Sequence, residues 1–371
     1  MDRRTFLQGS SALLLPGYSS VTHAGGVANT ARFLSCGADR KGDFFVASFL
    51  PTGRVAFSAS LPSRGHDIAQ RPSNPEVVII ARRPGNTVTV VDTITFAVTR
   101  QFRVPENRHL YGHGVFSPDG TRFFTTENDF ASGNGVIGIY DVGAGYQRLG
   151  EHRAGGIGTH QLSISSDGRT ITVANGGIRT HPDTGKSKLN IGTMKPNFTF
   201  LDTSSGRILQ SFSLDKDLHQ LSIRHFDESS RGQYAIGMQF EGDRRRNVPL
   251  VALLDRRDGF KFLKGSPVKR TIMEQYVGSI RFDTSGSFVA ASCPRGNHIV
   301  VWNVDTEELV CAFPAEDASG LTATGKIGEF LATGGNGMLY RIDAVRPKIT
   351  LVADRNINRR WDNHAHILTL S

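Results

Sequence analysis

Short hydrophobic runs recur along this chain, and turn-forming residues separate them. The clearest copy is residues 111–141, YGHGVFSPDGTRFFTTENDFASGNGVIGIYD. Residues 115–116 and 123–126 suit β-strands, and the sequence SPDG at 117–120 suits a tight turn between them. Proline presets φ at a turn position, and glycine accepts a positive φ. The segment therefore predicts a hairpin, a loop and a third strand that ends at Asp141.

The same layout returns along the chain, with similar turns at residues 165–168 and 283–286. The positions that open each copy are His66, His113, His160, His219, Gly278, Gly320 and His364. From position 66 to 113, 160, 219, 278, 320 and 364 the intervals are 47, 47, 59, 59, 42 and 44 residues. These intervals are close to the roughly 40–50 residues of a four-stranded propeller blade. The third strand of each copy ends near an aspartate that we expect to open the next turn: Asp92, Asp141, Asp202, Asp255, Asp305 and Asp343.

The first copy lacks its opening strand. Residues 31–63 hold only three strand-like runs, at 32–36, 44–49 and 55–59. The run at residues 364–370 has the form of the missing strand. If it joins the first copy, it closes the ring and covers an exposed sheet edge. The sequence therefore predicts an all-β fold: a seven-bladed β-propeller of four-stranded blades, with the C-terminal strand closing blade 1.

Composition agrees with one large all-β domain. The chain has 371 residues, 41 of them glycine, and a net charge of +9. The basic residues are scattered without a recognition motif, so we expect no nucleic-acid partner. No apolar run approaches the roughly 18 residues that span a bilayer, so we expect no transmembrane segment. The cysteines Cys36, Cys293 and Cys311 are odd in number, and we expect mostly free, half-buried thiols.

The N-terminus has the features of an export signal. Residues 2–8, DRRTFLQ, resemble the twin-arginine motif, and a weakly apolar segment follows at 12–18. The small-residue sequence THA at 22–24 suits a cleavage site. We therefore expect residues 1–24 to be a twin-arginine signal peptide, residues 25–371 to be a single propeller domain, and the protein to be periplasmic.

Longer motifs carry a resemblance to known proteins. The pattern G-H-x-V-x-S-P-D-G is similar to the YVTN-type propeller repeat. With the Arg-Arg leader, GHDIAQRPSNPEVVIIARRPG at 65–85, THQLSISSDG at 159–168 and WDNHAHIL at 361–368, the chain resembles an uncharacterised family of bacterial propellers. Those proteins are exported by the twin-arginine route and are often encoded beside imelysin-type, iron-regulated periplasmic proteins. The resemblance implies the fold, the compartment and an imelysin-type partner, but no established activity.

Histidine recurs with the repeat. Because the first strand of each propeller blade lines the central channel, we expect the repeated histidines to converge at one channel mouth. His366 lies two residues after His364 and so faces the same side of its strand. Imidazole is a common ligand of transition metals. We therefore predict a site for a transition metal, iron or copper, whose ligands are His66, His113, His160, His219, His364 and His366. His225 falls off the repeat position and is expected to be an ordinary histidine.

Loops on the same face supply further polar groups. Glu127 could ligate the metal or orient a histidine, and Arg82 and Arg179 could hold an anionic substrate or co-ligand. A histidine-rich mouth argues against a Ca²⁺ or Mg²⁺ site. Three functions stay open at this point: a metal-binding propeller, a non-catalytic protein-interaction scaffold, and an enzyme that acts on a small anionic substrate.

Overall fold

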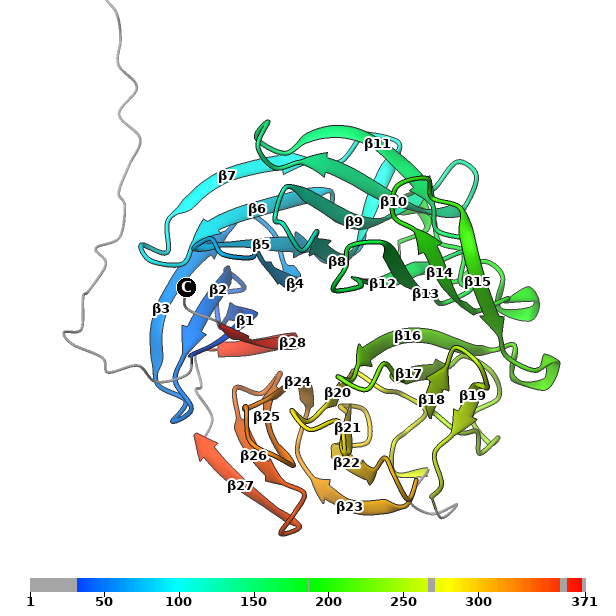
Figure 1. The fold of residues 1–371 in the computed structure, drawn as a ribbon. Coiled ribbons are helices and arrows are strands. Elements are labelled where there is room, and N and C mark those ends of the chain that lie inside the picture. Colours follow the sequence, from blue (N-terminus) through cyan, green and yellow to red (C-terminus); the bar gives the residue numbers. More distant parts are fainter. Residues whose placement is uncertain (1–31, 186, 266–270, 354–358, 369–371) are drawn as a thin grey trace, which may run out of the picture. The chain divides into compact units, whose positions relative to one another are not determined.

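Seven four-stranded antiparallel sheets form a ring, with their innermost strands around its centre (Figure 1). The structure, a computed structural model, describes residues 32–185, 187–265, 271–353 and 359–368. The prediction of a seven-bladed propeller is confirmed. The predicted signal peptide, residues 1–24, lies outside the described residues.

The strands follow one another from the inside of each blade to its outside, except in blade 1. Blade 1 holds β28 (Arg359–Leu368), β1 (Arg32–Asp39), β2 (Phe44–Phe49) and β3 (Val55–Leu61), and blade 2 holds β4 (Gly65–Gln70), β5 (Glu76–Ala81), β6 (Thr87–Asp92) and β7 (Val98–Arg103). Blade 3 holds β8 (Arg108–Phe116), β9 (Arg122–Asp129), β10 (Asn134–Asp141) and β11 (Gln147–Arg153), and blade 4 holds β12 (Thr159–Ile164), β13 (Thr170–Asn175), β14 (Asn197–Asp202) and β15 (Ile208–Ser213).

The remaining blades have the same order. Blade 5 holds β16 (Leu221–Glu228), β17 (Tyr234–Phe240), β18 (Val251–Asp255) and β19 (Gly259–Phe262), and blade 6 holds β20 (Ser279–Phe282), β21 (Phe288–Cys293), β22 (His298–Asn303) and β23 (Leu309–Pro314). Blade 7 holds β24 (Ala318–Ala323), β25 (Glu329–Gly334), β26 (Leu339–Asp343) and β27 (Lys348–Ala353). The short 3-10 helices are η1 (Pro182–Thr184) and η2 (Ile191–Thr193) between β13 and β14, and η3 (Lys216–Leu218) before β16.

The hydrophobic core lies between neighbouring blades. The second strand β5 is buried at every residue but its first, whereas the outermost strand β7 is exposed along almost its whole length. Val78, Phe116 and Tyr140 belong to one cluster between blades 2 and 3. Sheets that pack face to face bury both faces of their middle strands, which explains the apolar runs in the sequence.

Local turn chemistry follows the sequence closely. The Gly120 N–H donates to the Ser117 carbonyl at 2.8 Å, and Gly120 has a φ of 67°. The carboxylate of Asp202 accepts the Ser205 N–H at 2.8 Å and so opens the turn after β14. In blade 6 the side chain of Asn303, rather than the predicted Asp305, accepts an N–H at 2.9 Å, because an amide oxygen serves as well as a carboxylate.

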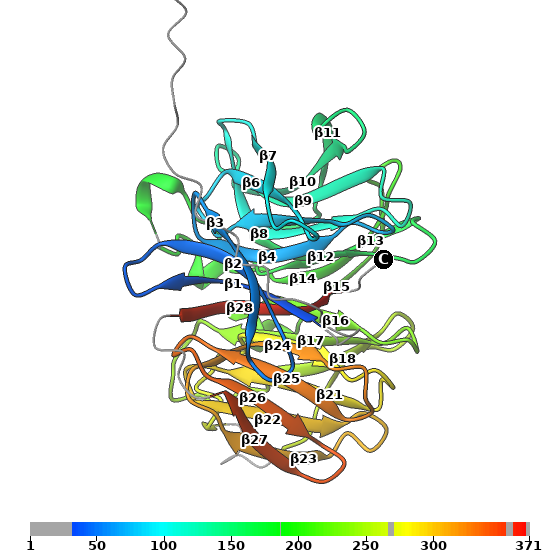
Figure 2. The same cartoon turned by 90° about the vertical axis from the view of Figure 1, so that its left-hand side faces the viewer.

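The C-terminal strand closes the ring, as predicted. In the side view β28 lies next to β1 (Figure 2), and the two pair in antiparallel register with Ser35 opposite Ala365. The Ser35 hydroxyl also donates to the His364 carbonyl at 2.7 Å. Trp361 on β28 packs against Phe49 of blade 1, with ring centroids 5.1 Å apart, in a cluster that includes Leu331 of blade 7. This cluster joins the two ends of the ring.

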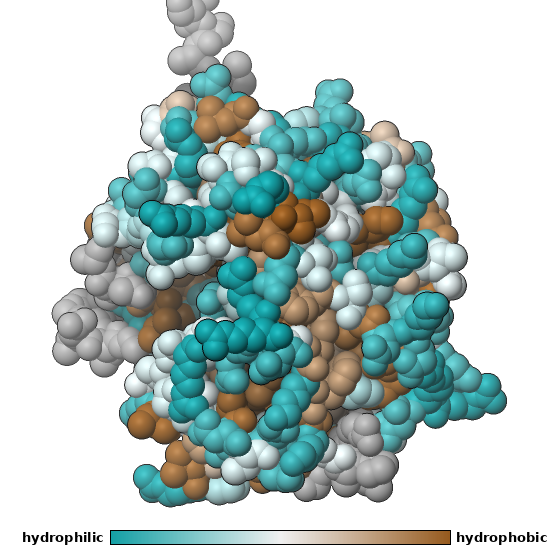
Figure 3. Space-filling model, turned by 45° about the vertical axis from the view of Figure 1, so that its right-hand side comes forward, coloured by the Kyte–Doolittle hydropathy of each residue, from teal (hydrophilic) through white to brown (hydrophobic). Residues whose placement is uncertain are grey.

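The three cysteines lie inside the fold, and the surface is mixed in character. Cys36, Cys293 and Cys311 form no disulfide with one another, as expected, and they are buried rather than half-buried. Hydrophobic side chains on the face in Figure 3 form separate patches among hydrophilic ones. In the part of the chain that the structure describes, no helix has the length and apolar character of a membrane span.

The Trp361→Ala variant is expected to lose about 3–5 kcal/mol of unfolding free energy, because it empties the contact between blades 1 and 7. Ile367→Ala is the matched control on the same strand, since Ile367 is 41% exposed. Urea unfolding followed by fluorescence and circular dichroism measures both. Equal losses in the two variants would contradict this account of closure.

Candidate functional site

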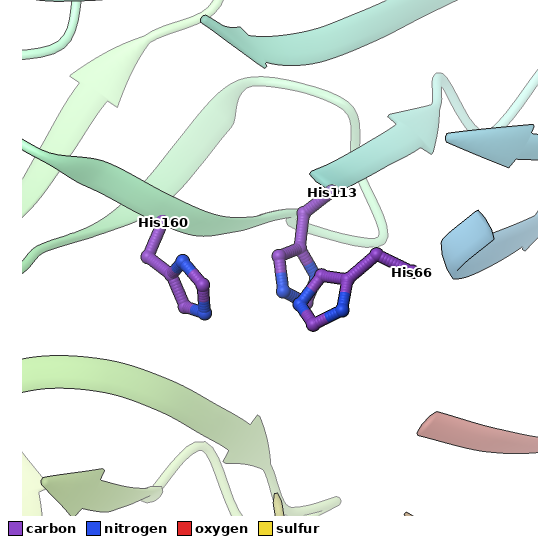
Figure 4. A group of neighbouring side chains, drawn as sticks. All are labelled: His66, His113 and His160. Atoms are coloured by element: carbon purple, nitrogen blue, oxygen red, sulfur yellow. The ribbon is translucent and has the colours of Figure 1, made fainter. Parts of the chain in front are cut away.

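Irregular pairing in the innermost strands positions the histidines. In β4, Gly65 pairs with Ala81 and Asp67 with Ile80, which leaves His66 in a bulge. In β12, His160 occupies the corresponding place between Thr159 and Gln161. A bulge removes one residue from the ladder and re-aims its side chain. His66, His113 and His160 thus reach from neighbouring blades into the same central space (Figure 4).

Histidines from five consecutive blades meet at the centre: His364, His66, His113, His160 and His225, all buried. Ring centroids lie 4.8 Å apart for His66 and His364, and 4.7 Å apart for His160 and His225. Nitrogens of His66, His113 and His160 lie within 4.8 Å of one another, and so do those of His113, His225 and His364. Either set could hold a metal ion.

In blade 5 the structure brings His225 rather than His219 to the centre. His219 follows η3 and is only half-buried, and its Nδ1 lies 2.8 Å from the Lys216 carbonyl. His225 lies inside β16, just past a bulge. One signal that could have found it is the distance to the turn glycine after the strand, which is seven residues from His225 to Gly232, as from His113 to Gly120, and eight from His160 to Gly168. The prediction from the intervals between repeats chose His219 instead, because residues inserted before β16 lengthen the interval in this blade.

Carboxylates lie beside the imidazoles. Asp67 Oδ2 is 2.7 Å from His113 Nδ1, and Asp67 Oδ1 is 2.6 Å from His366 Nε2. His366 therefore contacts Asp67 instead of joining the central cluster. Burial alone would raise the pKa of Asp67, but His113 and His366 hold that pKa well below its ordinary value. Such partners fix the tautomer and orientation of a histidine ligand.

A second carboxylate, Asp362, connects the cluster to the arginines above it. Its oxygens lie 2.5 Å from Arg64 Nε, and 3.5 Å from both Arg82 and His66 Nδ1. The last distance is too long for a strong hydrogen bond. Burial would raise the pKa of Asp362, yet His66, Arg82 and Arg64 hold it far below its ordinary value, so the carboxylate stays ionised.

Four imidazoles of the cluster, those of His66, His160, His225 and His364, have lowered pKa values, and nitrogens of the cluster lack hydrogen-bond partners in the part of the chain that the structure describes. Burial lowers the pKa of His66 to about 4, and burial with neighbouring imidazoles lowers the pKa values of His160 and His225 well below 6.5. The pKa of His364 is lowered in the same way. Among the described residues, His113 Nε2, His160 Nδ1 and both nitrogens of His364 are buried without a hydrogen-bond partner. Each such atom costs on the order of 1–3 kcal/mol, which a bound ligand would recover.

Two of the other predicted residues lie elsewhere. Arg82 stands above the cluster, near Asp362. Glu127 is buried in a separate network, where it accepts hydrogen bonds from Tyr140 at 2.8 Å and Arg148 at 2.9 Å. Arg179 is exposed in the insertion between β13 and β14. The structure thus brings only Arg82 of these three to the histidines.

A cavity of about 180 Å³ opens above the cluster. His66, His160 and His225 line it together with Arg82, Arg83, Arg224 and Tyr111. A second cavity of about 420 Å³ lies beside it and shares Arg82, Tyr276 and Asn363 with the first. A ligand can therefore approach the imidazoles from one face, past a rim of arginines.

Residues 59–368 match a family described as "Protein of unknown function (DUF1513)". The chain belongs to this family. Together with the fold, this supports the resemblance to an uncharacterised propeller family, while the twin-arginine leader, the YVTN-type repeat and the imelysin-type neighbour remain predictions.

Two further proteins are similar to this DUF1513 member. Over 117 residues it is 31% identical to the dihydro-heme d1 dehydrogenase of Pseudomonas aeruginosa, a match that covers 30% of this chain and 22% of that protein. The chain thus spans about a fifth of that relative. Hydrazine synthase of Kuenenia stuttgartiensis has a similar structure, with a TM-score of 0.59 over 91% of this chain and 99% of that one. The sequence identity is 15%, so this likeness shows the fold alone.

The metal-free protein is expected to lose stability as the pH falls from 7 to 5. The pKa of His66 is about 4 in the folded chain and 6.5 for a free imidazole, so the unfolded chain takes up its proton first. The contribution of His66 to the free energy of unfolding is therefore complete above pH 6.5 and is lost as the pH falls toward 4. At pH 5 this loss is about 2 kcal/mol for His66 alone. Urea unfolding at several pH values, with His66→Gln for comparison, measures this. The same pH slope in both proteins would refute the assignment.

Proposed function

We propose that this DUF1513 protein binds one transition-metal ion through His66, His113, His160, His225 and His364, and that it serves iron or copper handling in the periplasm. The observation that carries the proposal is the convergence of five buried imidazoles with unpartnered nitrogens. A non-catalytic scaffold would not require these side chains, since an apolar core would stabilise the ring centre at lower cost.

The geometry favours one ion rather than two. His113 belongs to both sets of ligand atoms. Its Nδ1 is engaged by Asp67, which leaves Nε2 as the donor. A single imidazole nitrogen binds one ion, so both sets would contribute to the same ion through His113. The other four imidazoles would complete the coordination around that ion.

The donors also limit the choice of metal. Neutral imidazole nitrogens suit copper, zinc, nickel and iron, whereas Ca²⁺ and Mg²⁺ take oxygen ligands. The buried thiol of Cys36 lies outside both sets of ligand atoms. Copper is expected to bind most tightly in vitro by the general order of divalent affinities, and supply in the cell would decide between copper and iron.

Other support comes from the relatives and the leader. The name of the Pseudomonas relative refers to heme d1, which supports metal-linked chemistry and is compatible with an ion that is bound as part of a metal-containing ligand. The periplasmic location rests on the motif at residues 2–8. An imelysin-type partner rests on resemblance only and remains a prediction.

His113→Ala is expected to abolish stoichiometric metal binding, because it removes the ligand common to both sets. The wild-type protein is expected to bind one Cu²⁺ or Zn²⁺ per chain. Calorimetric titration of metal-free protein, with elemental analysis after desalting, measures both. His219→Ala is the control and should bind as the wild type does, while His225→Ala should bind more weakly. Loss in the His219 variant with none in the His225 variant would reverse the assignment of blade 5.

Asp67→Asn is expected to weaken metal binding about 10- to 100-fold, since His113 loses the carboxylate that holds its tautomer. The control is Asp183→Asn, whose carboxylate is 87% exposed beside His181. Competition against a chromogenic chelator gives both affinities. An Asp67 variant that keeps wild-type affinity would show that the carboxylate does not orient the ligand.

A further inference from the structure

Arg83 stands out in the cavity above the histidine cluster. It is half-buried, and in the described part of the chain its guanidinium makes no hydrogen bond or ion pair. Burial lowers its pKa, and the positive charges of Arg224 and Arg82 lower it further. A guanidinium that is partly withdrawn from water and faces other cations is stabilised by a counter-ion. A negatively charged group in the cavity would supply one.

The acids near the cavity cannot supply it. Asp362 is already shared by Arg64 and Arg82, and Glu241 by Lys188 and Arg224. Arg224 is held in place by Ser222, whose hydroxyl oxygen accepts a hydrogen bond from its Nε at 2.9 Å. These two carboxylates are thus shared by four cations, Arg64, Arg82, Lys188 and Arg224, and neither forms an ion pair with Arg83.

We infer that this cavity binds a small oxyanion, through a carboxylate or phosphate group held by Arg83 and Arg224 with Arg82 at the rim. Guanidinium groups match such anions through paired N–H donors. The cavity of about 180 Å³ has room for about six water molecules, which is more than a small carboxylic acid or a phosphate ion needs. The inference rests on the proposed function in one respect: the anion would lie over the metal ion and supply an oxygen ligand to it.

Metal and anion are then coupled. The arginines repel a bound cation, and an anion between them removes that repulsion. The anion should therefore tighten metal binding, and by reciprocity the metal should tighten anion binding by the same factor, on the order of ten-fold. The anion would act as a substrate or as a co-ligand of the metal only when the metal site and the anion site are both occupied.

The test begins with the metal-free full-length protein. Acetate and inorganic phosphate are titrated separately by calorimetry at constant ionic strength, and these two probes distinguish the carboxylate and phosphate sources. Arg83→Gln should weaken binding of the preferred anion at least ten-fold, and Arg83→Lys should weaken it less because the charge remains. The control is Arg257→Gln, an exposed residue in the turn after β18, which should bind as the wild type does.

Folding is checked by circular dichroism and thermal melting, and removing the Arg83 side chain breaks no hydrogen bond or ion pair among the described residues. If the wild type binds neither anion, or if Arg83→Gln binds as tightly as the wild type, the inference is overturned. If Arg83→Gln and Arg83→Lys bind the anion equally weakly, paired hydrogen bonds rather than charge alone hold it. That result would also support the anion site.

A final titration separates this inference from the proposed function. Zn²⁺ alone is added to Arg83→Gln without acetate or phosphate, and it should bind at least as tightly as in the wild type, since one repelling charge is gone. Metal binding without any anion binding would retain the proposed function and reject the anion site. Anion binding by a protein that takes up no metal would do the reverse.

Discussion

The pairing of β28 with β1 is the contact on which the rest of this structure depends. It joins the two ends of the described chain, so blade 1 acquires its innermost strand and the edge of β1 that faces the ring centre is covered. The same strand carries His364 to within 4.8 Å, ring to ring, of His66 and His113. Without this pairing the propeller would remain open and the histidine cluster would lack one of its members. Fold and site thus share one constraint.

The ring centre is polar where a packed interior would ordinarily be apolar. Its imidazoles lie in or next to irregularly paired positions of strands whose other residues pack against neighbouring blades, so the site is built without disturbing the inter-blade core. The lowered pKa values of His66, His160, His225 and His364 keep these rings neutral, which reduces the cost of burying them, and Asp67 holds the orientation of the His113 ring. The imidazole nitrogens that remain without hydrogen-bond partners lower the stability of the folded protein, and a bound ion would offset this loss.

The site is also asymmetric. Blades 1 to 5 contribute histidine, whereas blade 6 has Gly278 and blade 7 has Ser319 near the corresponding position. Small residues leave room on that side, where the larger cavity lies against Tyr276, Arg295 and Ser319. Neutral imidazoles therefore form the floor of the site, and arginines form its rim. A cation below and an anion above would each stabilise the other.

The sequence by itself determined the repeat, the number of blades, the turn chemistry and the closing strand, because turns and strand patterns depend on residues that are close together in the chain. It also identified four of the clustered histidines as candidate ligands: His66, His113, His160 and His364. Only the tertiary structure decided that His225 replaces His219, that Glu127 serves a separate ion pair, and that Arg179 lies outside while Arg83 faces the cavity. The physical reason is that one bulge or one inserted loop changes the face on which a side chain emerges, and local pattern does not reveal it.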